Sequence, residues 1–189
     1  TLTIPTAGVL NPQEGTVECW WNPLAKTPQE YPGLISTGNW TSTATQDWFV
    51  IYWGSGWGNG DRVGFGMYNK NGTRNFEFSI ILYPQPYTWY YVVAKWSFID
   101  RIAKLIIYKP DGSFVSNQAT IVGEPPTFEG WDKFYVLQGW NNSIHRANSL
   151  IDDLRISSRA RTDEEIAAAY QSGQPLPVDE YTTAKMNFD

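Results

Sequence analysis

Hydrophobic and polar side chains alternate with a period of two along most of this 189-residue chain. Val63, Phe65 and Met67, for example, alternate with small or polar neighbours. Such alternation is typical of β-strands that bury one face. The segments that show it, separated by Gly, Pro, Asn or Asp, are 16–22, 33–38, 47–53, 62–68, 73–82, 88–97, 103–109, 113–122, 134–139, 148–156 and, as an edge or closing strand, 180–188.

Turn sequences indicate how these strands pair. Asn69-Lys70-Asn71-Gly72 and Pro110-Asp111-Gly112 are typical of hairpins between neighbouring strands. Repeated local pairing favours an antiparallel arrangement over a parallel sheet with crossover helices. We therefore predict an all-β, antiparallel two-sheet sandwich in which residues 1–189 form one domain.

One segment has helical rather than strand periodicity. Thr162 and Glu165 have the spacing of a capping box, in which each side chain bonds the other residue's backbone N–H. Ile166 and Tyr170 follow at helical spacing, and Gly173 is placed to end the helix. The pattern predicts one short C-terminal helix over about 163–172.

Composition supports the sheet prediction and excludes some partners. Ten Trp, eleven Tyr and nine Phe suit pleated surfaces. The net charge is −5 and no basic cluster is present, which argues against nucleic acid and anionic membrane surfaces. No apolar run approaches the about 20 residues of a membrane span. The chain opens without a signal peptide, so we expect a domain excised from a larger protein.

Cysteine and histidine offer little chemistry. Cys19 is the single cysteine, and it alternates with its neighbours as a buried strand residue would. The lone His145 cannot build a metal cluster or a triad with it by any sequence signature.

Three segments, in order, resemble laminin G-like jelly-roll domains of the concanavalin A-like lectin and glucanase superfamily. They are residues 14–23 (EGTVECWWNP), 88–94 (TWYYVVA), and 151–156 (IDDLRI) with 159–166 (RARTDEEI). The closing residues 173–189 look most like such modules in phage or prophage tail and minor structural proteins. The resemblance implies two sheets packed face to face and an extracellular or virion-associated location. It leaves function open, because this fold hosts lectins, adhesion modules, hydrolases and spacers.

The hydrolases of this superfamily use carboxylates on one strand: Glu, then Asp two residues on, then Glu three further. The chain has no such triplet. Glu129 and Asp132 fall in a Pro- and Gly-rich loop, and Asp152 and Asp153 are consecutive, so on a regular strand they face opposite sides. We therefore expect no enzyme activity.

Tryptophans are the best candidates for a binding site. Eight of them exceed what one sandwich core can readily bury: Trp40, Trp48, Trp53, Trp57, Trp89, Trp96, Trp131 and Trp140. Flat aromatic faces suit the apolar faces of sugar rings, and Asn or Arg supplies directed hydrogen bonds. We expect Trp57, Arg62, Trp140 and Asn141, with Trp53, to bind the ligand. The alternative is that several of these side chains pack at the two ends of the core.

The resemblance also implies a calcium site, with Asp152 or Asp153 as the metal ligand, since Ca2+ prefers carboxylate and carbonyl oxygens. The alternative is that Asp153 faces solvent and Asp152 makes a hydrogen bond near the helix turn.

The leading hypothesis is a non-catalytic carbohydrate or cell-surface recognition module of an extracellular or virion tail protein. Its partners would be a glycan or cell-surface polysaccharide and the other domains of the parent protein. The second hypothesis is a structural or protein-interaction module with no small ligand. The third is a glycan hydrolase of the same fold.

Overall fold

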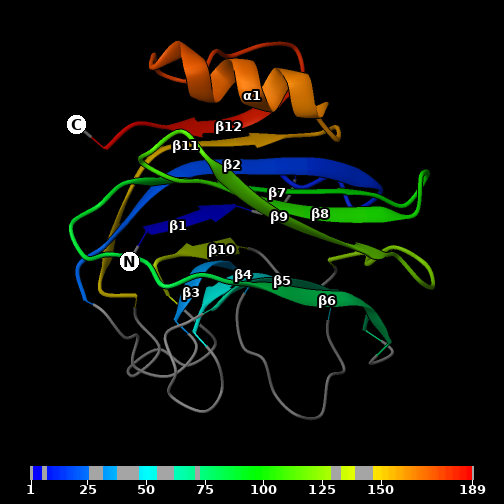
Figure 1. Ribbon diagram of the computed structural model, residues 1–189. Helices are drawn as coiled ribbons and strands as arrows, with labels where there is room; N and C mark the ends of the chain where they lie inside the picture. Colours follow the sequence, from blue (N-terminus) through cyan, green and yellow to red (C-terminus); the bar gives the residue numbers. More distant parts are fainter. Residues whose placement is uncertain are drawn as a thin grey trace.

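Two six-stranded antiparallel sheets pack face to face, and one helix lies on the outer face of one of them (Figure 1). The computed structural model describes residues 2–5, 8–25, 32–37, 47–54, 62–70, 73–128, 133–138 and 147–188. The predicted fold class is confirmed: the domain is a jelly-roll sandwich with a single helix among its described residues. That helix lacks the length and apolar character needed to cross a membrane.

We call the sheet farther from the helix sheet A. Its strands, in spatial order, are β1 (Leu2–Pro5), β10 (Lys133–Val136), β3 (Gly33–Ser36), β4 (Trp48–Trp53), β5 (Arg62–Tyr68) and β6 (Arg74–Ile81). The strands of sheet B, in the same sense, are β12 (Thr182–Met186), β11 (Ser149–Ser157), β2 (Glu14–Pro23), β7 (Tyr90–Ser97), β8 (Ile102–Tyr108) and β9 (Phe114–Thr120). Every neighbouring pair is antiparallel.

Each strand predicted from the sequence is present, with small differences at the ends. The expected hairpin turn at 110–112 joins β8 to β9, and Gly112 there has φ +83°, a left-handed conformation that glycine adopts without strain. The prediction missed β1, which pairs with β10. Its four residues end at Pro5, so the alternation is too short to recognise.

Tryptophan and phenylalanine rings fill the space between the sheets. Trp21, Trp53 and Trp96 are fully buried, and the Trp21 and Trp53 rings meet edge to face at 5.2 Å. The Trp21 indole N–H donates to Ser149 Oγ at 3.0 Å, which satisfies its polar atom. Cys19 lies in the same core, as predicted.

The helix α1 (Asp163–Ser172) has the predicted ends. Thr162 Oγ1 accepts from the Glu165 N–H, the Glu165 carboxylate accepts from the Thr162 N–H, and Gly173 takes the left-handed conformation. Ile166 is the buried residue of the helix, and Tyr170 stacks on Tyr108 with ring centroids 4.4 Å apart. This apolar face forms a second cluster on the outer side of sheet B.

A buried ionic network holds the segment after α1 against sheet B. Glu18 of β2 pairs with Arg155 of β11, whose Nη1 donates to the Pro177 carbonyl at 2.8 Å. Arg161 Nη2 donates to Asp179 Oδ1 at 2.8 Å. The chain from 173 to 181 is therefore fixed by charge-assisted bonds to the outer face of sheet B.

Candidate functional site

The outer face of sheet A carries polar and aromatic side chains over β4, β5 and β6. On β5, Val63, Phe65 and Met67 enter the core, so the alternate positions, including Gly64 and Gly66, face outward. The register places Tyr52 of β4 opposite Gly64. A Cβ added at Gly64 would lie 2.0 Å from Tyr52 Cζ, so the tyrosine ring lies directly over this glycine.

On the other side of β5, Gly66 pairs with Glu77 of β6, whose side chain is half-buried. Tyr68 Oη donates to Glu77 Oε2 at 2.5 Å, and Tyr52 Oη reaches Glu77 Oε1 at 3.5 Å. Burial, together with the bond to Glu77, raises the pKa of the Tyr68 phenol, which keeps it a protonated donor. Arg74 Nε lies 3.7 Å from Glu77 Oε2, and the Arg74 guanidinium sits over the Tyr68 ring.

Two further side chains extend this region. The Trp48 ring, half-buried, packs against Tyr68 with centroids 4.9 Å apart. Arg62 is exposed at the start of β5, in phase with Gly64. We call the set the sheet A patch: Trp48, Tyr52, Arg62, Tyr68, Arg74 and Glu77. Aromatic faces beside a few directed polar groups are what a carbohydrate site requires.

Of the five residues that the sequence predicted as one ligand site, the structure describes Arg62 and Trp53. Trp57, Trp140 and Asn141 lie outside the described residues, as do Trp40 and Trp131. Arg62, which belongs to the sheet A patch, is exposed.

Trp53, in contrast, belongs to the core. Its side chain is 0% exposed, because on β4 it is in phase with Phe49 and Ile51 and points between the sheets. The assignment of Trp53 to the ligand site is corrected accordingly.

Tyr52, Tyr68 and Glu77 were missed by the sequence prediction. The available signal was the pair of glycines at the outward positions of a strand. Gly64 and Gly66 would weaken an isolated strand, and glycine inside a strand often marks a place where another group approaches closely. Here that group is the ring of Tyr52, which only glycine accommodates.

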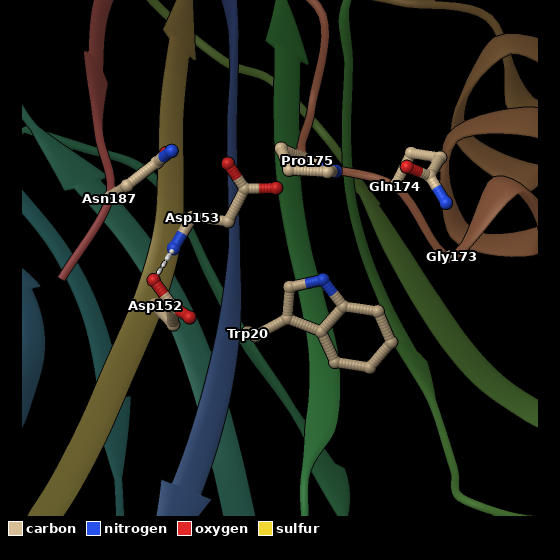
Figure 2. A pocket seen from close by; sticks show the side chains of 7 residues that line it. All are labelled: Trp20, Asp152, Asp153, Gly173, Gln174, Pro175 and Asn187. Carbon is tan, nitrogen blue, oxygen red and sulfur yellow. Dashed lines mark hydrogen bonds between the residues drawn. The ribbon is translucent and has the colours of Figure 1, made fainter. Parts of the chain in front are cut away.

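Asp152 and Asp153 lie on a different surface, beside the segment that follows α1. The pairing of β11 with β2 is regular up to Asp152 and resumes at Arg155, and Asp153 has φ +48°. This bulge turns both aspartates toward one pocket (Figure 2). The expectation that they face opposite sides of a regular strand is therefore wrong.

The pocket, which we call the helix-side pocket, has a volume of about 220 Å³. Figure 2 shows the Trp20 indole as its floor, with Asp152 and Asp153 on one side and Gln174 on the other. A neighbouring hollow of about 310 Å³ shares Trp20 and Asp152 and adds Trp89. Trp20 packs on Tyr91 and Tyr170 outside the sandwich, whereas its neighbour Trp21 lies in the core.

The alternative to a calcium site is wrong for Asp153, which does not face solvent, although Asp152 does make hydrogen bonds. Asp153 is buried at 7% exposure rather than facing solvent. Its Oδ2 accepts from the Leu176 N–H at 2.5 Å, just beyond the helix, and its Oδ1 lies 3.4 Å from Lys185 Nζ. Asp152 Oδ1 accepts from the N–H groups of Asp153 and Phe188.

These residues as arranged do not fit a calcium site. Ca2+ takes roughly six to eight oxygen ligands. In addition, the Lys185 ammonium beside Asp153 opposes a second cation at that carboxylate. Within the part of the chain that the structure describes, no three His, Cys, Asp or Glu side chains are grouped to hold a metal ion.

Residues 1–167 match the family model described as the concanavalin A-like lectin/glucanases superfamily, of laminin G type. No curated protein sequence matches the chain.

Solved structures share its fold at low identity. The enzymatically active domain of tailspike protein 2 from bacteriophage CBA120 aligns with a TM-score of 0.65 at 10% identity, covering 98% of this chain and 28% of that one. The carbohydrate-binding module CBM40 of the Ruminococcus gnavus IT-sialidase, bound to α2,3-sialyllactose, aligns with 0.61 at 14% identity, covering 82% and 81%. Domains LG4-5 of the mouse laminin α1 chain align with 0.57 at 14% identity, covering 95% and 42%. The chain thus spans little more than a quarter of that tailspike domain.

Proposed function

The chain belongs to the concanavalin A-like lectin and glucanase superfamily, and we propose that it is a non-catalytic carbohydrate-recognition module of an extracellular or virion-associated protein. Its ligand is a glycan or cell-surface polysaccharide, and its other partners are neighbouring domains of the parent protein. The observation that carries the proposal is the sheet A patch, where aromatic rings surround the Glu77 carboxylate on an outward sheet face.

The patch has the two components that bind sugars. Tyr52 and Trp48 provide flat apolar surface, and the Tyr52 ring lies directly over Gly64, whose missing side chain leaves room for it. Glu77 is oriented by Tyr68, while 29% of its side chain stays exposed, so that it can accept from sugar hydroxyls. Groups fixed before the ligand arrives lose little entropy on binding.

The same geometry supports a binding role over hydrolysis. Glycosidases need two carboxyl groups about 5 to 9.5 Å apart. Strands β4, β5 and β6 contain one acidic residue between them, Glu77. Asp47, which precedes β4, is buried and accepts from the N–H groups of Lys70, Thr127 and Phe128. The oxygens of the Asp47 carboxylate are therefore used in hydrogen bonds between segments of the chain.

Two tryptophans outside the described residues are also part of the proposed site. Trp57 belongs to the segment between β4 and β5, and Trp140 and Asn141 follow β10, a strand of the same sheet. Together with Arg62 they would supply stacking and hydrogen bonds around the patch. The structural similarity to a sialyllactose-binding module and to a phage tailspike domain supports a glycan ligand and an extracellular or virion setting.

A glycan array probed with the chain, with and without Ca2+, tests the proposal. We expect selective binding to some glycans, lost on Glu77→Gln and kept on Glu164→Gln, an exposed change on the helix. Absence of binding to every glycan under both conditions would contradict the proposal and leave a structural role.

Trp57 and Trp140 have their own test. Trp57→Ala and Trp140→Ala should abolish binding and leave the melting temperature nearly unchanged. If both variants instead unfold more easily by several kcal/mol, these side chains are core residues and that part of the site is wrong.

A further inference from the structure

The helix-side pocket has features of a second binding site, on the opposite side of the sandwich from the sheet A patch. The two hollows that meet at Trp20 and Asp152 have volumes of about 220 and 310 Å³. They are at or below the lower end of the volumes typical for small-molecule sites, about 300 to 1,000 Å³, so each suits a single ring or a short chain.

The floor and rim of the pocket are aromatic. Trp20 is half-buried and is held by Tyr91 and Tyr170, with ring centroids 5.2 and 5.7 Å away, so its orientation is set before any ligand binds. Trp89 is 38% exposed at the edge of the adjoining hollow. An exposed indole on a polar protein surface is available for stacking on a sugar ring.

The polar groups of the pocket are mainly acceptors. Asp153 lines the pocket, and its buried Oδ1, which accepts no hydrogen bond, lies 3.4 Å from the Lys185 ammonium. Asp152 uses Oδ1 for two backbone N–H groups, and its Oδ2 receives no bond from the described residues. A cationic ligand that donates to Asp152 Oδ2 therefore forms a charge-assisted hydrogen bond with an acceptor that the described residues leave available.

The net negative charge of the site also favours a ligand that donates hydrogen bonds. The charged residues that line the two hollows, among the described residues, are Asp152 and Asp153. Lys185 Nζ, 3.4 Å from Asp153 Oδ1, compensates one of the two negative charges. The remaining charge favours a cation, and the indole faces of Trp20 and Trp89 favour an organic cation in particular.

We propose that the helix-side pocket, formed by Trp20, Trp89, Asp152 and Asp153, binds an amino sugar through its protonated primary amine. The ammonium donates to Asp152 Oδ2, since an ammonium has three donors and no acceptor, while Asp153 stays paired with Lys185. The apolar face of the sugar ring lies on Trp20, and Asn187 and Gln174 at the rim bond to ring hydroxyls. The same charge repels anionic sugars.

The bulge in β11 is what creates this site. On a regular strand, one of the two aspartates would enter the core and the other would stay outside. With Asp153 in the left-handed conformation, both carboxylates reach the same pocket. Strained residues of this kind persist where the surrounding structure supports them, and they are concentrated at functional sites.

The test is a titration of the chain, followed by NMR at the Trp20 indole N–H, with methyl glucosaminide, methyl N-acetylglucosaminide and methyl glucoside at a pH where the amine is protonated. We expect the glucosaminide to bind about tenfold more tightly than the other two. Asp152→Asn, which keeps an oxygen for the two backbone N–H groups, should remove this preference. Glu164→Gln should keep it. Equal affinity for the three sugars, or an unchanged preference in Asp152→Asn, would overturn the proposal.

A second titration tests whether the bound amine belongs to a sugar or to a lysine side chain. A blocked lysine derivative carries the same ammonium on an alkyl chain, and we expect it to bind more weakly because it lacks a ring to stack on Trp20. Binding as tight as that of the glucosaminide would mean that the pocket takes a lysine side chain and would overturn the sugar assignment. Glu77→Gln should leave the glucosaminide titration unchanged, so failure of this site and failure of the sheet A patch are distinguishable.

Discussion

Arg155 and Glu18 form an ion pair that is almost completely removed from water, with Arg155 Nη2 2.7 Å and Nε 2.8 Å from Glu18 Oε2. The two side chains are 2% and 0% exposed. Glu18 Oε1 accepts from Tyr91 Oη at 2.7 Å, and Arg161 Nε approaches Oε2 at 3.6 Å. A fully bonded network of this kind makes the position of the segment after α1 specific, and that segment supplies one wall of the helix-side pocket.

Removal of one partner from this network should be severe. Glu18→Gln leaves Arg155 buried without its counter-charge, and we expect a loss of about 3 to 5 kcal/mol in the free energy of unfolding, measured by urea titration. As a matched control, Glu164→Gln on the exposed helix surface should change it by less than about 0.5 kcal/mol. A small effect of Glu18→Gln would show that water reaches the network.

The helix cap gives a smaller and more local effect. Thr162→Ala removes the acceptor for the Glu165 N–H and should cost about 1 kcal/mol of stability. Thr162→Ser keeps the hydroxyl and should be nearly neutral. Equal losses in both variants would mean that the methyl group of Thr162, rather than its cap, stabilises the helix.

The contribution of Glu165 should depend on pH. The bond from Arg159 lowers the pKa of the Glu165 carboxyl to about 2 in the folded chain, from its ordinary 4.5. Because the folded pKa is the lower one, the stabilisation is complete above pH 4.5 and is lost as the pH falls from there toward about 2. Urea titrations between these limits should show the stability difference between the native chain and Glu165→Gln shrinking as the pH falls. A difference that stays constant would contradict this reasoning.

The Cys19 thiol should not react with alkylating reagents in the folded protein. Burial, with the nearby Glu18 charge, raises the pKa of its thiol to about 12, so almost no reactive thiolate forms near neutral pH. We expect iodoacetamide to label Cys19 only after the chain is unfolded in denaturant, as followed by mass spectrometry. Rapid labelling under native conditions would show that β2 opens locally.

The parts of the fold that were predicted correctly depend on local sequence. The capping box at Thr162 and the alternation along β5 are set by neighbouring residues, so they are visible without a structure. Trp53 was misassigned because the glycine-rich segment after it suggested an exposed loop, whereas its phase with Phe49 and Ile51 places it in the core.

The candidate sites depend on contacts between distant segments. The bulge at Asp153 is stabilised by Leu176 and Lys185, which come 23 and 32 residues later. No local sequence pattern predicts it. The position of Tyr52 over Gly64 requires the register of β4 with β5. Sequence alone gives the residue types in such sites but not which of them meet.

The most direct test of glycan recognition at sheet A is to titrate the isotopically labelled chain with the best glycan from the array and follow its amide NMR signals. The proposal predicts the largest shifts at Tyr52, Gly64, Gly66 and Glu77, with Ile166 in the helix unaffected. Shifts confined to α1 and sheet B, or no shifts at a saturating concentration, would contradict the assignment of the glycan site to the sheet A patch.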